Sequence, residues 1–143
     1  MTSEYTIREF DFIADYDRVL SLWQSMEAGM HVGPSDTPQE IQKKLERDPD
    51  LFLVAESKDE ILGSIIGAFD GRRGMIYHLA VQREARRHGI GQALLTEVEK
   101  RLQAKGCIKC LLVVLEDNKA AMQFYEECGW KIVPEDRVFA KLF

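Results

Sequence analysis

One short segment of the chain has residues suited to binding an anion, Arg86-Arg87-His88-Gly89-Ile90-Gly91. It lies between an expected strand and an expected helix, where free backbone N–H groups and the helix dipole attract negative charge. Glycine there lets a phosphate group approach the backbone closely. The segment is not a Walker A loop, because no Gly-Lys-Ser/Thr follows, and Leu94 stands where a dinucleotide-binding fingerprint needs a third Gly or Ala. Taken alone, it is explained equally well as a solvated, glycine-rich start of a helix.

Three cysteines could carry other chemistry: Cys107, Cys110 and Cys128. Cys107 and Cys110 have the spacing of a metal-binding pair, but no second pair of ligands follows them, so we expect no metal. We interpret them as buried or idle thiols. Cys110 falls in an expected buried strand and Cys128 at the end of an expected helix. Neither position suits a reactive thiol, so we expect no covalent intermediate.

The elements that must position these residues are predicted by the periodicity of apolar side chains. No repeat, low-complexity tract or linker interrupts residues 1–143, so we expect a single domain. The expected elements in chain order are a strand over 5–9, a helix from about 15, a helix from 38 to about 47, strands over 51–55, 61–69 and 75–81, a helix from 90 to 106, a strand over 111–114, a helix from 118 to 129, and strands over 130–133 and 138–143.

The connections decide how these strands pair. Short turns join the three strands between residues 51 and 81, so they must form an antiparallel meander. The helix from residue 90 connects the third of them to the strand at 111–114, which predicts a right-handed βαβ unit with parallel strands. That last strand is apolar on both faces and is expected to be buried. The sequence therefore predicts an α/β fold, a mixed and mostly antiparallel sheet of about seven strands with a central parallel pair and about four helices.

Charge and composition argue against two kinds of partner. The formal net charge is −5, whereas a nucleic-acid backbone favours an excess of Lys and Arg. Residues 1–75 carry a net −7 and residues 76–143 a net +2, so an anionic ligand suits the second half and a cationic substrate the first. The longest apolar run, residues 110–115, is too short to span a membrane, and the N-terminus lacks the features of a signal peptide. We expect a cytoplasmic protein without nucleic-acid or membrane partners, as a monomer or a homodimer.

The anion-binding segment resembles the Arg/Gln-x-x-Gly-x-Gly/Ala motif of the GCN5-related N-acetyltransferase (GNAT) superfamily. It follows Leu79-Ala80-Val81, which resembles the central strand of that family. The run Asn118-x-x-Ala121-x-x-Phe124-Tyr125-x-x-x-Gly129-Trp130 is similar to a second family motif. The resemblance covers nearly the whole chain and implies the GNAT fold, in which the central parallel strands splay apart. The turn Asp70-Gly71-x-Arg73-Gly74 also resembles the small bacterial YpeA-like branch.

The resemblance implies acetyl-CoA as a co-substrate and no metal. The pyrophosphate of acetyl-CoA needs an anion nest, and its extended pantetheine arm needs strand-like hydrogen bonds. By similarity, amides of residues 87–92 would hold the pyrophosphate, Leu79 and Val81 would pair with the pantetheine arm, and Asn118 would reach its amide groups. One of the two strand amides would also donate to the thioester oxygen. The implied cofactor-binding residues are Leu79, Ala80, Val81, Arg86, Arg87, His88, Gly89, Ile90, Gly91, Gln92, Asn118 and Tyr125.

The resemblance also implies a catalytic acid, because family members place the tyrosine that matches Tyr125 beside the sulfur of the cofactor. A phenol with a pKa of roughly 10 can protonate a departing thiolate with a pKa near 8.5. The alternative is that Phe124 and Tyr125 are simply a packed aromatic pair. Phe124 alone would satisfy the packing, so the hydroxyl of Tyr125 favours the catalytic interpretation.

No carboxylate base carries over from the family. One branch uses a glutamate early in the fourth strand, where this chain has Met75, and another uses a glutamate in the fifth strand, where it has Val113. His78 and Glu116 remain as candidates. His78 lies on the strand that faces the acetyl group, although a lone histidine on a strand is more often a satisfied core residue. Glu116 is explained more simply as a neighbour of the Asn118 helix cap.

These features together predict an N-acetyltransferase that moves an acetyl group directly from acetyl-CoA to a primary amine in a ternary complex. The acceptor stays open between a peptide or protein N-terminus, a lysine side chain and a small amine. The alternative is a non-catalytic acyl-CoA-binding or sensing module, favoured by the missing carboxylates at positions 75 and 113. A weaker alternative is a phosphate-backbone binder that uses Arg83, Arg86 and Arg87, which the net charge disfavours.

Overall fold

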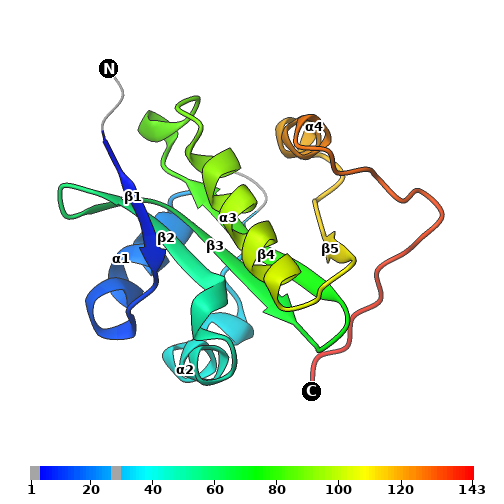
Figure 1. Ribbon diagram of the computed structural model, residues 1–143, viewed down its shortest axis with the longest axis horizontal. Coiled ribbons are helices and arrows are strands. Elements are labelled where there is room, and N and C mark those ends of the chain that lie inside the picture. Colours follow the sequence, from blue (N-terminus) through cyan, green and yellow to red (C-terminus); the bar gives the residue numbers. More distant parts are fainter. Residues whose placement is uncertain (1–3, 27–29) are drawn as a thin grey trace. The chain divides into compact units, whose positions relative to one another are not determined.

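The computed structural model describes residues 4–26 and 30–143. The chain divides into two compact units, one ending at Val113 and the other beginning at Val114. A five-stranded sheet with the strand order β1-β2-β3-β4-β5 is the centre of the first unit (Figure 1). Its strands are β1 (Thr6–Glu9), β2 (Phe52–Ser57), β3 (Glu60–Phe69), β4 (Gly74–Val81) and β5 (Cys110–Leu112).

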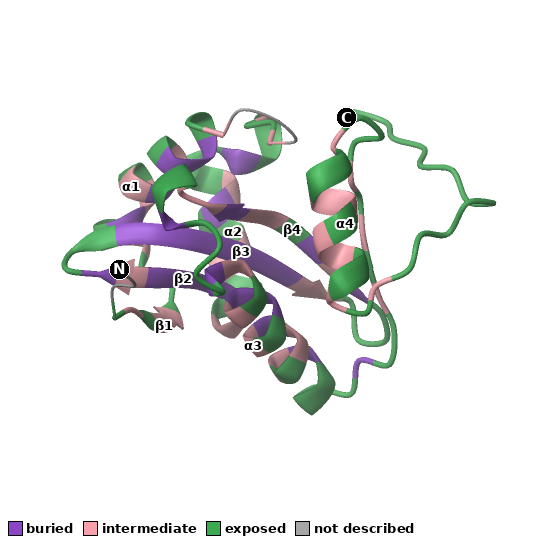
Figure 2. Cartoon of the chain, turned by 90° about the horizontal axis from the view of Figure 1, so that it is seen from above, coloured by how far each residue is buried: buried purple, intermediate pink, exposed green. Residues whose placement is uncertain are grey.

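Helices cover both faces of this sheet. They are α1 (Phe12–Gln24), α2 (Pro38–Arg47) and α3 (Ile90–Ala104), with short 3-10 turns η1 (Pro34–Asp36), η2 (Pro49–Leu51) and η3 (Arg83–Ala85). Helices α1 and α3 lie on opposite faces (Figure 2). Ile41 of α2 belongs to the same buried cluster as Val19 and Trp23 of α1. The core is therefore a sheet enclosed between two helical layers.

The strand pairing follows the expected topology. Strands β1 to β4 pair in sequence order and antiparallel. Helix α3 then leads to β5, which pairs with β4 in parallel from Gly74↔Cys110 to Ile76↔Leu112. The antiparallel meander and the parallel βαβ pair are both confirmed. The close approach of α3 to the sheet depends on glycine, because a Cβ atom added at Gly67 would lie only 2.9 Å from Val98 of the helix.

Short-range signals set the helix boundaries. Thr37 Oγ1 accepts a hydrogen bond from the backbone N–H of Glu40 at 3.3 Å, so Thr37 is the N-cap of α2. The same helix ends at Arg47 before Asp48-Pro49. Gly106 follows the end of α3 with φ +96°, in the left-handed conformation that glycine supplies after many helices.

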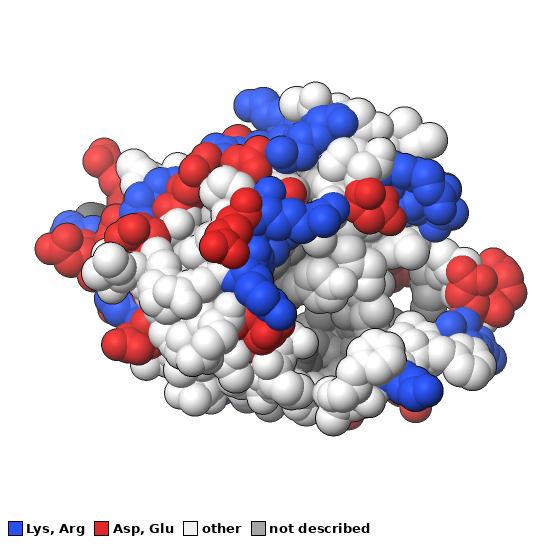
Figure 3. Space-filling view, turned by 90° about the horizontal axis from the view of Figure 1, so that it is seen from below, with Lys and Arg blue, Asp and Glu red and all other residues white. Residues whose placement is uncertain are grey.

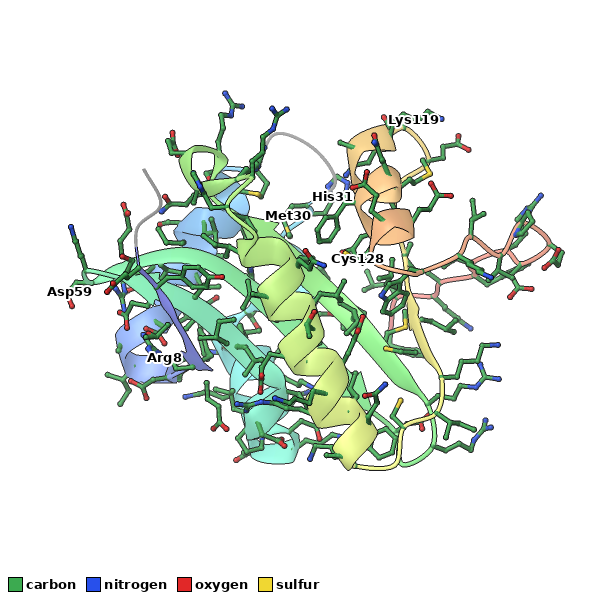
Figure 4. All side chains as sticks on the ribbon, turned by 45° about the horizontal axis from the view of Figure 1, so that its top comes forward. Arg8, Met30, His31, Asp59, Lys119 and Cys128 are labelled. Atoms are coloured by element: carbon green, nitrogen blue, oxygen red, sulfur yellow. The ribbon has the colours of Figure 1, made fainter. Side chains whose placement is uncertain are left out.

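A cluster of ion pairs around one buried carboxylate ties β1 and α1 to the start of the sheet. Asp15 is fully buried and accepts hydrogen bonds from Arg8 at 2.7 and 2.9 Å and from Arg18 at 2.8 Å. Both arginines also contact Glu56 of β2. Figure 4 shows Arg8 beside α1. We refer to Arg8, Asp15, Arg18 and Glu56 as the arginine–carboxylate cluster.

The second unit contains one α-helix, α4 (Lys119–Glu127); Figure 4 labels its first residue, Lys119, and Cys128, which follows its last residue. Asn118 Oδ1 caps it by accepting a hydrogen bond from the N–H of Ala121 at 3.2 Å, as expected. Gly129 ends the helical segment with φ +92°. Within the described parts of both units, no helix combines the length and apolar character that a transmembrane segment needs.

The end of the chain departs from the prediction. Residues 130–133 and 138–143 form no strand, so the described sheet has five strands rather than about seven, and the parallel pair lies at its edge rather than at its centre. The expectation that residues 111–114 are buried is also wrong for Leu111 and Val113, which are 37% and 56% exposed. Apolar alternation predicts that a segment can form a strand, but only a hydrogen-bonded neighbour makes it one.

Candidate active site

Strand β4 is distorted at His78. Tyr77 pairs with Ile66 and Ala80 pairs with Ser64, so two residues of β4 stand opposite the single residue Ile65 of β3. His78 itself has φ +51°, which is uncommon for a residue with a side chain. Such a β-bulge bends the strand and redirects side chains, and bulges are often found beside active sites.

Beyond this bulge, one edge of β4 offers unpaired amides. Within the described residues, the β4–β5 ladder ends at Ile76, although β4 continues to Val81. The N–H of Gln82 donates to the carbonyl of Leu62 at 2.8 Å, on the β3 side. Because successive amides of a strand point to opposite edges, the N–H groups of Leu79 and Val81 point toward the side that β5 has left.

Ala80 has a different part in this edge. It pairs with Ser64 of β3, and its side chain is 3% exposed within the buried core cluster. Its contribution is therefore to hold β4 in place between the two outward-pointing amides. Among the residues described, β4 and β5 share only the three pairs that begin at Gly74, and the expected splaying of the parallel strands stays a prediction.

The glycine-containing loop leads from this edge into α3. Arg87 and Gly89 both have positive φ angles, +68° and +78°, and Gly89 is the N-cap residue. The first bond of the helix runs from the N–H of Ala93 to the carbonyl of Gly89 at 2.9 Å. The N–H groups of residues 90–92 therefore have no acceptor within the helix. They form the kind of positive, amide-lined end that binds phosphate groups.

The basic side chains of the loop are exposed, as are His88 and Gly89. Arg86 Nε donates to the carbonyl of Val81 at 3.1 Å, which fixes the loop against the end of β4. A Cβ atom added at Gly89 would meet no atom within 4 Å, so the space in front of the loop is open. On the face shown in Figure 3, Lys and Arg are interspersed with Asp and Glu rather than forming one continuous basic surface.

His78 is held by residues from three other elements. Its Nε2 atom lies 2.9 Å from Oδ1 of Asp36 in η1, and its ring lies 4.5 Å from the ring of Trp23 in α1. Ser64 of β3 accepts from Trp23 Nε1 at 2.9 Å and donates to the carbonyl of His78 at 3.4 Å. Asp36 was not predicted, because nothing in a loop sequence marks an aspartate as buried.

Two of the expected site residues, Asn118 and Tyr125, belong to the second unit. The amide oxygen of Asn118 is engaged in capping α4. Tyr125 packs edge-on against Phe124 and Trp130, with ring centroids 5.2 and 6.1 Å away. Burial, and to a lesser extent Cys128, raise the pKa of the Tyr125 phenol to about 12. The phenol therefore keeps its proton throughout the neutral range.

The cysteines are all free thiols. A Cβ atom added at Gly74 would lie 2.9 Å from Cys107 Sγ and 3.1 Å from Cys110 Sγ, so both sulfur atoms pack around this glycine. Burial, followed by the neighbouring Cys107, raises the pKa of the Cys110 thiol to about 12. A thiol that holds its proton so firmly is a poor nucleophile, which supports the interpretation of this pair as structural.

Comparison with known proteins agrees with these features. The chain is 42% identical over 120 residues to an acetyltransferase of Pectobacterium atrosepticum, a match that covers 83% of each chain. It is 43% identical over 124 residues to an acetyltransferase of Photorhabdus laumondii, covering 86% of this chain and 82% of that protein. Residues 16–130 match the acetyltransferase (GNAT) family. The chain belongs to this family of acyltransferases.

Solved structures share the fold. Ard1 from Thermoplasma volcanium superimposes with a TM-score of 0.78 at 25% identity, over 90% of this chain and 84% of that one. The PaiA N-acetyltransferase from Thermoplasma acidophilum, in complex with coenzyme A, also has a TM-score of 0.78, at 22% identity over 93% of both chains. Members of the family use acetyl-CoA as the acetyl donor.

Proposed function

We propose that this enzyme transfers an acetyl group from acetyl-CoA directly to a primary amine within a ternary complex. The observation that carries the proposal is the continuity of two features: the outward amides of Leu79 and Val81 and the amide-lined loop that ends at Gly89. An extended amide-rich arm and a pyrophosphate follow one another in acetyl-CoA in the same way. The two features thus suit two parts of one ligand.

In this proposal the loop and the strand bind different parts of the ligand. The N–H groups of residues 90–92 bind the pyrophosphate, with Arg86, Arg87 and His88 around it. Leu79 and Val81 extend the sheet by pairing with the pantetheine arm, as an added strand would. The resemblance to the family assigns Asn118 to the amide groups of the pantetheine arm and Tyr125 to its sulfur.

The reaction needs one bond to form and one to break. The free amine attacks the thioester carbon, and the developing negative oxygen is stabilised by the N–H of Leu79 or Val81. The carbon–sulfur bond then breaks. Tyr125 donates its proton to the departing thiolate, and His78 accepts the proton that the amine loses. The raised pKa of Tyr125 means that the phenol carries its proton at neutral pH, as a proton donor must.

The direct assay is thiol release from acetyl-CoA with three groups of acceptors: small amines, peptides with a free N-terminus, and N-terminally blocked peptides that contain lysine. We expect amine-dependent release with one group, and an acetylated product whose mass is that of the acceptor plus one acetyl group. Acetyl-CoA that binds without any turnover across the panel would instead indicate the non-catalytic module.

Three finer assignments belong to the same proposal. The turn at residues 70–74 supports a place in the small bacterial YpeA-like branch. The family match over residues 16–130 spans both compact units, which supports a single functional domain. The three free thiols support the reducing environment of the cytoplasm.

A further inference from the structure

We infer that Asp36 is a positioning residue that selects the catalytically competent tautomer of His78. The inference rests on the proposed function and adds to it a residue that holds the proton acceptor. Asp36 would keep the ring proton on Nε2, so that the lone pair of Nδ1 is free to take the proton from the acceptor amine.

The direction of the hydrogen bond follows from the chemistry of its partners. An ionised carboxylate can only accept hydrogen bonds, so the 2.9 Å contact between Asp36 Oδ1 and His78 Nε2 requires a proton on Nε2. In a neutral imidazole the other nitrogen, Nδ1, is then unprotonated and basic. The tautomer is therefore determined by the position of one carboxylate oxygen.

Asp36 is itself held by two further hydrogen bonds, so it can impose this direction. Its second carboxylate oxygen, Oδ2, accepts from the N–H of Gly33 at 3.0 Å. Its backbone carbonyl accepts from the hydroxyl of Tyr16 at 2.7 Å. The residue is 7% exposed. With both carboxylate oxygens occupied, the group has little freedom to turn away from the imidazole.

The imidazole is equally constrained. Trp23 packs against the ring at an interplanar angle of 56°, and the Trp23–Ser64 pair fixes the carbonyl of His78 from the other side. The positive φ of His78 costs conformational energy, and the surrounding contacts maintain it. Backbone strain of this kind is concentrated at functional sites.

The Nδ1 atom is accessible. Among the described residues, no hydrogen bond to Nδ1 of His78 is formed, and no buried side-chain nitrogen or oxygen is left without a partner. Because His78 is a half-buried residue, an unpaired Nδ1 must reach solvent. It does so one residue before Leu79, whose amide lies on the open edge of β4. The basic nitrogen is thus close in the chain to the group assigned to the thioester oxygen.

The contact could instead serve only to anchor η1 to β4. An anchoring role does not depend on which nitrogen carries the proton, whereas the positioning role does. Asp36→Asn separates the two, because the side chain is nearly isosteric. The amide oxygen of the introduced asparagine must accept the hydrogen bond from the N–H of Gly33. The NH₂ group of the same amide then faces Nε2 of His78. The ring must then accept at Nε2 and carry its proton on Nδ1.

The test measures the tautomer and the reaction together. The protein is labelled with ¹⁵N at histidine, and the two ring nitrogens of His78 are assigned by NMR at about pH 9, where imidazoles are neutral. In the wild type we expect a protonated Nε2 and an unprotonated Nδ1. In Asp36→Asn we expect the reverse, together with a fall in kcat of about ten- to a thousandfold and an unchanged KM for acetyl-CoA.

Asp48→Asn is the matched control, since Asp48 is also 7% exposed but pairs with Lys44 in α2. It should change neither the tautomer of His78 nor kcat. A wild-type ring protonated on Nδ1 would overturn the inference without any variant, and so would Asp36→Asn with a reversed tautomer and a wild-type kcat. Failure of the proposed function is distinguishable, because it would appear as a wild-type protein that neither is stabilised by acetyl-CoA nor releases thiol.

Discussion

Among single residues, the hydroxyl of Tyr125 is the group whose removal should affect turnover most selectively. Tyr125→Phe retains the ring that packs against Phe124 and Trp130. We expect an acetyl-CoA dissociation constant close to that of the wild type and a kcat lower by about ten- to a thousandfold. Steady-state kinetics and calorimetric binding measure the two effects.

Tyr5→Phe, which removes a hydroxyl from outside the site, should leave both values unchanged.

With the pKa of Tyr125 at about 12, the phenol of Tyr125 stays protonated up to about pH 11. The wild-type rate should therefore not decline between pH 8 and 10. Equal turnover by wild type and Tyr125→Phe would rule out a proton-donating role.

His78 should determine how the rate depends on pH. Positions 75 and 113 carry no carboxylate that could act as a base. Without any base, only the fraction of the acceptor amine that is already deprotonated would react. For an acceptor that titrates near pH 10, the rate would rise about tenfold per pH unit up to about pH 9. A working imidazole base makes this rise shallower, because it accepts the proton that the amine loses. The titratable groups facing His78 are Asp36, directly, and Tyr16, through the carbonyl of Asp36.

We therefore expect His78→Ala to lower the rate at pH 7 and to steepen the profile, measured as kcat/KM from pH 6 to 9.5. His31→Ala, which removes an exposed imidazole, is the control and should keep the wild-type profile. A wild-type plateau that begins below pH 6 would instead indicate a carboxylate base.

At the scale of elements, the loop before α3 should be sensitive to any side chain at Gly89. Gly89→Glu adds a carboxylate at the point where the amides of residues 90–92 converge, and it places a side chain at φ +78°. We expect acetyl-CoA binding to fall below detection in calorimetry. Gly71→Glu is the control. It also places a side chain at a positive φ angle, +104°, with open space around it, so its backbone strain is similar. Gly71 lies in the turn between β3 and β4, away from the loop before α3. Equal loss of binding in both variants would contradict the assignment of the loop.

The arginine–carboxylate cluster joins β1, α1 and β2 and should contribute to stability. Burial acts to raise the pKa of Asp15, but hydrogen bonds from Arg8, the N–H of Asp11 and Arg18 outweigh it, so the pKa lies below its usual value. A depressed pKa means that the stabilisation is present above the unfolded-state value, near pH 3.9, and is lost as the pH falls through the folded-state value.

Asp15→Asn should therefore lower the free energy of unfolding by about 2–3 kcal/mol at pH 7, because it weakens several charged hydrogen bonds in a buried position. Urea unfolding followed by circular dichroism measures this difference, which should shrink at about pH 2.5. Glu46→Gln, on the exposed surface of α2, should cost less than about 0.5 kcal/mol. A difference between wild type and Asp15→Asn that is as large at pH 2.5 as at pH 7 would contradict the ionised pairing.

For the whole molecule, ligand binding should stabilise the folded state. Acetyl-CoA at 100 times its dissociation constant should add about 2.7 kcal/mol to the free energy of unfolding. The increase in Tm, measured by differential scanning calorimetry, should be absent in Gly89→Glu and retained in Tyr125→Phe. A wild-type Tm that does not change up to millimolar acetyl-CoA would remove the basis of the proposed function.

Much of the architecture follows from local information in the sequence. The turn lengths between β2, β3 and β4 leave no connection other than antiparallel hairpins, and the length of the connection through α3 requires a parallel return. The caps at Thr37 and Asn118 and the glycine before α3 are also local, because each acts within four residues of its own position. Such features can be predicted because their energetics involve few residues, all adjacent in the chain.

Pairings between distant residues were decided only by the tertiary structure. Asp36 and His78 are separated by 41 residues and meet because a bulge in β4 turns His78 toward η1 and α1. The exposure of Leu111 and the absence of strands after Trp130 likewise depend on which sheet edges find partners. The sequence determined the helices, the strands of the meander and the turn that leads into α3, since these depend on local periodicity and turn chemistry. The tertiary structure decided which imidazole nitrogen is held and which strand edge is open, because these depend on contacts that no short window of sequence contains.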